Sequence, residues 1–471
     1  MFYNFVILGA GAAGITIALD IAKKNKNFSV ALVEAGGMEW SEESQNIYNL
    51  QYSNLESNDL FNLRLRYFGG TTNHWGGYCR PLDEEDFLDR PEINRLGWPI
   101  EKKKIDKYLI KAIEILDCKS SLSVRNNRGI SDLAVQESLG LEETEWIYSY
   151  PGIFSKKIKE INKTKNIDLF LNKTAIGISS LNDGGHIKSI DLIDTETKKN
   201  SKIEGEIFIV SMGGVESTRF LLNINRLGNY NFGNKSGNLG KGFMDHPHMT
   251  VGQYIAFKNF YYGNNRRDMR FLKTNYKYQK DKNILSTTLR IGKDYKKNNN
   301  LINEFNRFYK VKNTEINHTG YVHINSEQEL RNSNMIKLTN SFDDLNLPII
   351  NLELSYSDLD LITFRTGAKL AAKFFIKTNY GRLKLENWIY DESSKVPFDE
   401  FRYYGHHMGT TRMHNNNEIG VVDQNLKVHE TQNLYVASSS IFPTGGISNP
   451  TLTIVQISLY LSNLLTNNQK T

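Results

Sequence analysis

The sequence has few cysteines, no arginine-rich stripe and no long apolar run. Its 471 residues include only two cysteines, Cys79 and Cys118, which are too few for a disulfide framework or a thiolate metal site and which suit a reducing compartment. No window reaches about eighteen consecutive apolar residues, and no basic segment with a cleavage site surrounds the first apolar run. The sequence therefore predicts no membrane span and no export signal, and we expect a cytoplasmic protein.

The charge pattern argues against a nucleic-acid partner. The chain carries 58 Lys and Arg against 52 Asp and Glu, a formal net charge of +6 at pH 7, but the basic residues are not gathered into a stripe with interleaved aromatics. The hydrophobic fraction of 39%, with 24 Tyr and 24 Phe, is typical of a globular chain. A chain of 471 residues exceeds the size at which one hydrophobic core keeps growing, so we expect two or three joined domains.

The N-terminal motif predicts a dinucleotide site. Residues 5–8 form an apolar strand that stops at the first glycine of G-x-G-x-x-G, so strand, turn and helix follow in the required order. Gly9 permits the tight turn, Gly11 lets the backbone approach a pyrophosphate, and Gly14 lets the helix lie close to the strand. Glu34, twenty residues beyond Gly14, would accept a hydrogen bond from a ribose hydroxyl. An ordinary set of packing glycines would give the same pattern, and the motif does not distinguish FAD from NAD.

The spacing of apolar residues predicts the coarse organisation of the rest. Residues 99–118 place apolar side chains at helical spacing, which indicates an amphipathic helix. Residues 167–178 indicate a pair of strands, and residues 206–214 a parallel core strand. Beyond about residue 250, alternating segments predict an antiparallel sheet, followed by a helix at residues 358–378. An antiparallel sheet here is what a substrate domain inserted into a nucleotide-binding fold would supply.

Six ordered segments make the sequence resemble the glucose-methanol-choline (GMC) flavin oxidoreductases. They are the glycine fingerprint with its acidic residue, GGTTNHWGG at 69–77, GWPI at 97–100, IVSMGGVESTRFLL at 209–222, LGKGFMDHP at 239–247, and the C-terminal run that begins GHHMGTTRM at residue 405. The resemblance spans nearly the whole chain and implies FAD as the cofactor. It also implies an α/β fold, with a Rossmann-like FAD-binding domain assembled from discontinuous segments and an inserted α+β substrate domain built on an antiparallel sheet.

The resemblance implies where these domains lie. The expected ranges are 1–100, 155–255 and 398–471 for the FAD-binding domain, 256–397 for the substrate domain, and 101–154 for a helical or lid connection. The chain departs from the family in one place. Many members carry an aspartate in the run before Ser-x-x-Pro, whereas this chain has Ser438 within VASSSIFP, so we expect a neutral contact near the flavin pyrophosphate.

The resemblance places the chemistry where the C-terminal motif meets the flavin. Oxidation of an alcohol by a flavin needs a base with a near-neutral pKa, and histidine meets this need. The family's H-x-x-G-T spacing falls on His406 and directs His407 elsewhere, while the run SNPT puts Asn449 at the second catalytic position. An amide can hold the substrate oxygen but cannot take its proton, so the base would be His406 alone. The plainer alternative is that His406 or His407 merely packs on a strand. His246 and His248 flank Pro247 in an expected loop of the FAD-binding domain, where we expect a structural role.

His74 raises the question of a covalent flavin. It stands where pyranose oxidase-like and choline oxidase-like members bond a histidine to the flavin 8α-methyl group, and Trp75 strengthens the pyranose oxidase-like comparison. The glycines of this loop alone explain a close approach to the flavin, so a non-covalent contact stays the alternative. The full set of expected cofactor-binding residues is Gly9, Gly11, Ala13, Gly14, Glu34, Ala35, Gly70, Thr71, Asn73, His74, Trp75, Gly76, Ala175, Gly213, Ser438, Pro450 and Thr451, and no metal site is expected.

The resemblance favours an FAD-dependent oxidase or dehydrogenase that acts on a hydroxyl of a sugar, polyol or other alcohol. NPTLT after TGG resembles the sugar-oxidising branch, and oxygen or an unidentified acceptor would take up the electrons. Two alternatives stay open: a lyase of the same fold in which the flavin does not cycle, and a flavoprotein without turnover. Anaerobic bleaching of the flavin by substrate separates the oxidoreductase from the lyase.

Overall fold

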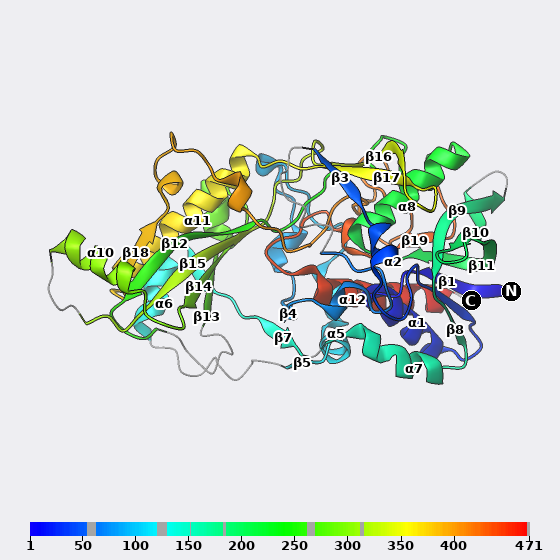
Figure 1. The fold of residues 1–471 in the computed structure, drawn as a ribbon, viewed down its shortest axis with the longest axis horizontal. Helices are drawn as coiled ribbons and strands as arrows, with labels where there is room; N and C mark the ends of the chain where they lie inside the picture. The colour runs from blue at the N-terminus through cyan, green and yellow to red at the C-terminus, as the bar shows by residue number, and fades with distance from the viewer. Residues whose placement is uncertain are drawn as a thin grey trace.

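Two sheets of different construction lie at opposite ends of the molecule (Figure 1). The structure is a computed structural model, and it describes residues 1–53, 63–119, 130–150, 152–181, 185–260, 269–310 and 315–468. One end is formed by a seven-stranded sheet, which includes the first strand of the chain, and by the last helix of the described chain. A six-stranded sheet covered by helix α11 forms the other (Figure 1).

The seven-stranded sheet is the nucleotide-binding framework. Its strand order is β8-β2-β1-β11-β10-β9, and β19 pairs with the second half of β11. The pairings among β8, β2, β1, β11 and β19 are parallel, whereas β10 pairs antiparallel with both β11 and β9. These strands are β1 (Phe2–Leu8), β2 (Val30–Val33), β8 (Ile167–Phe170), β9 (Lys173–Leu181), β10 (His186–Asp194), β11 (Asn200–Val210) and β19 (Leu434–Val436). β2 is buried throughout, as expected of a parallel strand covered on both faces.

The turn after β1 requires glycine. Gly9 has a φ of +101°, which a residue with a side chain rarely adopts. A Cβ atom at Gly14 would lie 1.9 Å from the Gly9 carbonyl oxygen, so only glycine lets α1 (Ala12–Lys24) approach the turn so closely. The predicted order of strand, turn and helix is confirmed. α12 (Pro450–Asn468) packs beside α1, and α8 (Gly213–Gly228) follows β11.

The six-stranded sheet presents one apolar face and one polar face. Its order is β18-β12-β15-β14-β13-β6, with antiparallel pairing throughout. Leu289 of β14 and Ile324 of β15 share a core with Phe364 of α11 (Asp358–Lys377). Because side chains alternate along a strand, the neighbouring positions point to the other face, which lines a cavity. The strands are β6 (Leu141–Glu143), β12 (His248–Ala256), β13 (Met269–Thr274), β14 (Thr287–Lys293), β15 (His318–Ser326) and β18 (Gly381–Leu385).

Smaller elements complete the described scaffold. Two three-stranded sheets have the orders β16-β17-β3 and β4-β7-β5, and their strands are β3 (Leu50–Ser53), β4 (Tyr78–Cys79), β5 (Cys118–Lys119), β7 (Ile147–Ser149), β16 (Met335–Phe342) and β17 (Pro348–Glu353). The remaining α-helices are α2 (Glu42–Asn46), α4 (Lys102–Asp106), α5 (Leu109–Ile115), α6 (Ile130–Ser138), α7 (Ile158–Lys163), α9 (Tyr276–Lys282) and α10 (Asn299–Tyr309). Across the described ranges, no helix combines the length and the apolar character needed to cross a membrane.

Most of the expected elements are present, with two differences. The parallel strand, the antiparallel sheet and the helix at residues 358–378 are confirmed as β11, the six-stranded sheet and α11. The single helix over residues 99–118 is wrong, because Tyr108, with φ −101° and ψ 0°, leaves the helical region between α4 and α5. The range expected to end the FAD-binding domain at residue 255 contains most of β12, which pairs with β15 and β18. The six-stranded sheet thus includes residues from His248 onward, and the domain ranges stay a prediction.

Candidate active site

A cavity of about 550 Å³ brings together residues from both ends of the molecule. This volume is in the range of cofactor and small-molecule sites. The expected site residues that line it are Gly9, Gly11, Ala13, Glu34, Ala35, Gly70, Thr71, His74, Trp75, Gly76, Ala175, Gly213, His406, Ser438, Asn449, Pro450 and Thr451. Two others lie behind its wall: Gly14 packs on the Gly9 carbonyl, and Asn73 donates a hydrogen bond to the Phe68 carbonyl at 3.0 Å.

Glu34 holds the turn that shapes one end of the cavity. Its side chain is 6% exposed, and its two oxygens accept hydrogen bonds from the backbone N–H groups of Ala10 at 2.8 Å and Gly36 at 3.0 Å. Burial raises the pKa of this carboxyl, and the two N–H groups oppose the rise. A carboxylate offers about four acceptor sites. Glu34 therefore retains capacity for a ribose hydroxyl, and this role stays a prediction.

The wall near Glu34 fits a phosphate-bearing cofactor. A Cβ atom built at Gly11 or at Gly213 would have no described atom within 4 Å, so both glycines face open room in the cavity. The helices α1, α8 and α12 all begin at this cavity. Helix N-termini offer free N–H groups and a positive dipole end, which favour anions, and the first turns of α1 (AAGI) and α12 (PTLT) are uncharged. The residues present would hold a dinucleotide, with its pyrophosphate at the start of α1.

His406 is held by a second histidine. Its Nδ1 atom lies 2.8 Å from Nδ1 of His246, whose Nε2 lies 2.9 Å from the Gly446 carbonyl oxygen. Because a carbonyl can only accept, neutral His246 carries its proton on Nε2 and presents a lone pair at Nδ1. His406 then donates from Nδ1, which leaves the lone pair on its Nε2. These contacts leave a lone pair on Nε2 of His406, which lines the cavity, whereas the sequence alone predicts only a structural role for His246.

The environment keeps both imidazoles neutral. Burial lowers the pKa of His246 to about 4, and burial together with the neighbouring histidines lowers the pKa of His406 well below its usual value. Asp245 fixes the backbone of the pair, since its Oδ1 accepts hydrogen bonds from the N–H groups of His246 at 2.6 Å and His406 at 3.1 Å. A neutral imidazole is the form that can accept a proton.

The rate of flavin reduction should stay constant through neutral pH and decline only on the acid side of about pH 6.5, the ordinary histidine value. The lowered pKa of His406 keeps the base unprotonated to lower pH, and activity is lost as the pH falls through that lowered value. Anaerobic rapid mixing with a substrate at a series of pH values measures the profile. An acid limb centred at or above the ordinary value would contradict this environment for the base.

Asn449 is fixed at the start of α12. Its Nδ2 donates to the Tyr78 carbonyl at 3.1 Å. The preceding Ser448 donates to the Pro81 carbonyl at 2.8 Å and accepts from Arg80 at 2.9 Å. An amide has two N–H donors and an acceptor oxygen, so Asn449 can still bind a hydroxyl group in the cavity that it lines.

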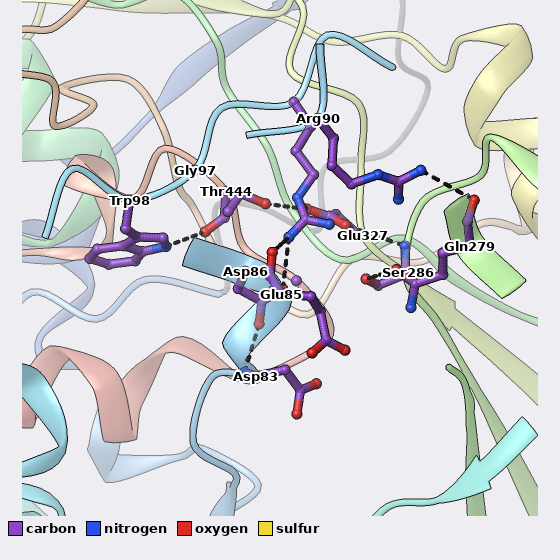
Figure 2. Close-up of polar contacts among 12 residues, drawn as sticks. Asp83, Glu85, Asp86, Arg90, Gly97, Trp98, Gln279, Ser286, Glu327 and Thr444 are labelled. Carbon is purple, nitrogen blue, oxygen red and sulfur yellow. Dashed lines mark hydrogen bonds and ion pairs between the residues drawn. The ribbon is translucent and has the colours of Figure 1, made fainter. Parts of the chain in front are cut away.

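A buried polar cluster connects the two ends of the molecule beneath this site (Figure 2). Arg95 lies 3.2 Å from Asp86 and 3.4 Å from Glu327, the residue that follows β15. Arg90 donates to the Gln279 carbonyl at 3.1 Å. Burial raises the pKa of Asp86 to about 7. Burial acts the same way on Glu327, but Arg95 and the hydrogen bonds from Thr444 and the Ser286 N–H together outweigh it and lower the pKa of Glu327. Buried charges that are paired in this way fix the segments that carry them.

The same cluster holds the loop that sets the histidine tautomers. Thr444 donates to Glu327, and its carbonyl accepts from Trp98 Nε1 at 3.3 Å (Figure 2). Two residues later, Gly446 has a φ of +52°, and a Cβ atom there would lie 2.5 Å from Asp86. The Gly446 carbonyl is the group that binds His246. The cluster thus positions the Gly446 carbonyl, from which a series of contacts runs through His246 to His406.

The cavity also has walls that the sequence motifs miss. Tyr78, Trp146 and Phe271 form an aromatic wall, with ring centroids 6.3 Å apart for the first pair and 5.9 Å for the second. Opposite residues of β14 and β15 form a polar wall of Thr288, Arg290, His323 and Asn325. All of these residues lie outside the six family-like segments, and Tyr78 directly follows one of them. The two-residue alternation along β14 and β15 could have indicated a polar face, but the sequence does not show that this face meets the C-terminal motif.

His407 lines the same cavity as His406. Its ring centroid lies 5.8 Å from that of Phe243, and its backbone lies against Gly214 at the start of α8. Burial lowers its pKa to about 3. His407 thus contacts Phe243 and the start of α8, whereas His406 contacts His246, and the choice of His406 as the base stays a prediction.

His74 lines the cavity just after the short helix Gly70–Asn73. Burial lowers its pKa, so its imidazole is neutral and carries a lone pair. The next residue, Trp75, donates from Nε1 to the Gly152 carbonyl at 3.2 Å, which fixes the loop. The placement is compatible with either a covalent or a non-covalent flavin.

If His74 is bonded to the flavin, acid-precipitated protein should stay yellow, and His74→Ala should release its flavin to the supernatant. The physical reason is that acid unfolds the protein and frees any flavin held only by non-covalent contacts. Flavin fluorescence of pellet and supernatant measures the distribution. Complete release from the unmodified protein would exclude the covalent bond and leave His74 as a loop residue.

Known proteins resemble this chain in part of its sequence and in its fold. Residues 331–458 match the family model described as GMC oxidoreductase, and no curated protein matches the chain. A pyridoxine 4-oxidase from Mesorbium loti shares 12% identity, with 99% of each chain covered and a TM-score of 0.63. A formate oxidase variant from Aspergillus oryzae RIB40 shares 17% identity over 100% of this chain and 99% of that one, with a TM-score of 0.59. An FAD-dependent oxidoreductase from Chaetomium thermophilum shares 14% identity over 99% and 100% of the chains, with a TM-score of 0.63.

These structures share the mixed α/β fold of the present chain over its whole length. The segment that matches the family model contains both His406 and Asn449. The expected family and fold class are therefore confirmed. Residues 331–458 thus match the GMC oxidoreductase family in sequence, and the whole chain has the fold of these oxidases and of the FAD-dependent oxidoreductase.

Proposed function

We propose that the protein oxidises a hydroxyl group of a sugar, polyol or other alcohol to a carbonyl. The observation that carries the proposal is a cavity that combines a dinucleotide cradle with a neutral, oriented histidine. FAD supplies the hydride-accepting chemistry when bound. In this oxidation the carbinol C–H bond breaks with its electron pair leaving as hydride, the hydroxyl proton passes to the enzyme, and the C=O bond forms.

The hydroxyl proton goes to His406. The tautomer set through His246 places the lone pair of His406 on Nε2, so this atom takes the proton. The positive charge that then forms is shared with His246 through the bond between their Nδ1 atoms. Asn449 donates a hydrogen bond to the substrate oxygen, which orients the hydroxyl and stabilises the charge that develops on it.

The walls of the cavity exclude water from the reacting carbon. Tyr78, Trp146 and Phe271 cover one side with aromatic rings, and Tyr404 covers another. Tyr404 stacks on His248 with ring centroids 3.7 Å apart and lies 5.4 Å from the His406 ring. A dry site strengthens the polar contacts to the substrate oxygen.

The test is a panel of sugars, polyols and simple alcohols on purified yellow protein, with oxygen and with a dye as alternative acceptors. Formation of a carbonyl product together with consumption of either acceptor supports the proposal. Comparison of the two acceptors also decides between an oxidase and a dehydrogenase. Substrate cleavage without acceptor consumption would indicate a lyase of the same fold and contradict the proposal.

A further inference from the structure

One wall of the cavity carries an arginine whose charge the site does not neutralise. Arg290 lies on β14, directly opposite His323 of β15, and lines the cavity. Its Nε atom is buried and has no hydrogen-bond partner in the structure. Of the described residues that line the cavity, the two carboxylates are Glu34 and Glu216. Glu34 is bound to backbone N–H groups of its own turn.

Glu216, the other carboxylate that lines the cavity, is also already paired. Glu216 forms ion pairs with Arg64 at 2.7 Å and with Arg219 at 3.4 Å. A guanidinium is charged at every physiological pH. Arg290 therefore presents a positive charge to the cavity, with a donor atom still open.

Two neutral groups beside Arg290 also lack partners. Thr288 is 1% exposed and Asn325 is 7% exposed, and they face each other across β14 and β15, two residue pairs along from Arg290 and His323 and therefore on the same face of the sheet. The Thr288 hydroxyl and the Asn325 side-chain oxygen are buried without a hydrogen-bond partner. Unpaired buried polar atoms cost free energy, and those in binding sites are commonly satisfied by the ligand.

We propose that this polar wall binds a carboxylate group of the substrate, so that the alcohol oxidised by the enzyme is a hydroxy acid. The inference rests on the proposed function, because it names the class of alcohol. Arg290 would bind the carboxylate through its planar N–H groups, and Thr288 and Asn325 would complete the hydrogen bonds around it. His406 and Asn449 would meet the hydroxyl in the same cavity.

The charge of the wall favours a carboxylate over a phosphate ester. Burial lowers the pKa of His323 to about 4 and that of His248 to about 3, and Arg290 adds to both shifts. Both imidazoles are therefore neutral at physiological pH, and Arg290 supplies one positive charge. A carboxylate carries one negative charge, whereas a phosphate ester carries about 1.5 to 2 at pH 7.

Binding of a probe that cannot be oxidised separates this inference from the proposed function. Acetate is titrated into the FAD-loaded enzyme while the flavin absorption spectrum is recorded, with acetamide as the neutral probe of the same shape and inorganic phosphate as the dianionic probe. We expect saturable binding of acetate, with weaker effects of the other two. Equal effects of acetate and acetamide, or tighter binding of phosphate, would overturn the carboxylate assignment.

Variants test whether Arg290 is the group responsible. Arg290→Met should weaken acetate binding by about 10- to 150-fold, the range expected for a lost charged hydrogen bond. Arg290→Lys should retain part of it, and Arg307→Met, which removes an exposed arginine from α10, should change nothing. Acetate binding that is unaffected in Arg290→Met would overturn the inference.

Oxidation gives an independent readout. The ratio of kcat/KM for glycolate to kcat/KM for ethylene glycol should fall at least about 10-fold in Arg290→Met, because only the acid loses a contact. Acetate binding that depends on Arg290, without oxidation of any alcohol, would leave the anion site standing and defeat the proposed function. Alcohol oxidation with no preference for the acid would support the proposed function and defeat the carboxylate site.

Discussion

His406→Ala should slow flavin reduction by about 10²- to 10⁴-fold, the usual cost of removing a positioned base. Substrate and FAD binding should change little, because the backbone of residue 406 is held by Asp245 and not by the imidazole. Stopped-flow reduction under anaerobic conditions measures the rate. The defect should shrink at high pH, where hydroxide and ionised alcohol partly replace the missing base.

Two matched variants show that the loss is specific to the base. Asn449→Ala keeps the base and loses one hydrogen bond to the substrate oxygen, worth about 0.5 to 1.5 kcal/mol, so its rate should fall less while KM rises. High pH should not restore it, since added hydroxide cannot replace lost orientation. If His406→Ala reduces its flavin at the unmodified rate while His407→Ala does not, the assignment of the base to the H-x-x-G-T position is wrong.

Glu34→Ala should weaken FAD binding by about 10- to 150-fold, corresponding to about 1.5 to 3 kcal/mol for a lost charged hydrogen bond. The carboxylate is buried, binds the N–H groups of Ala10 and Gly36, and lines the cavity where a ribose hydroxyl would lie. Its loss removes a ligand contact and loosens the turn that begins at Gly9. Titration of the apoprotein with FAD, followed by flavin fluorescence, measures the change.

A matched variant guards against a general loss of stability. Glu400→Ala removes an exposed carboxylate far along the chain and should bind FAD as the unmodified protein does. The melting temperature of each apoprotein shows whether the fold is intact. Unchanged FAD affinity in a folded Glu34→Ala protein, or a colourless protein that binds NAD instead, would contradict the assigned role.

The residues of the cofactor end could be predicted from the sequence because local backbone geometry dictates them. Gly9 must adopt a positive φ, and Gly14 must leave room for a carbonyl oxygen. The turn therefore requires glycine at both positions, so the glycine pattern in the sequence predicts the turn. The strand before these glycines and the acidic residue after β2 belong to the same strand-turn-helix-strand unit. Contact of the bound cofactor with these residues stays a prediction.

The substrate end could not be predicted in the same way, because its contacts join distant parts of the chain. His246 meets His406 across 160 residues, and the sequence offers no sign that these two rings are neighbours. Arg290 and Asn325 face the cavity because β14 and β15 pair in one particular register. A shift by one residue would turn both side chains to the opposite face.

The central claim is oxidation of a hydroxyl with cycling of the flavin, and one anaerobic measurement tests it most directly. The FAD-loaded enzyme is mixed with an excess of glycolate and of other alcohols from the panel in the absence of oxygen, the colour is followed, and the product is identified after one turnover. The account predicts loss of the yellow colour together with one equivalent of carbonyl product for each flavin. A substrate that is cleaved or otherwise converted while the flavin stays fully oxidised would contradict it.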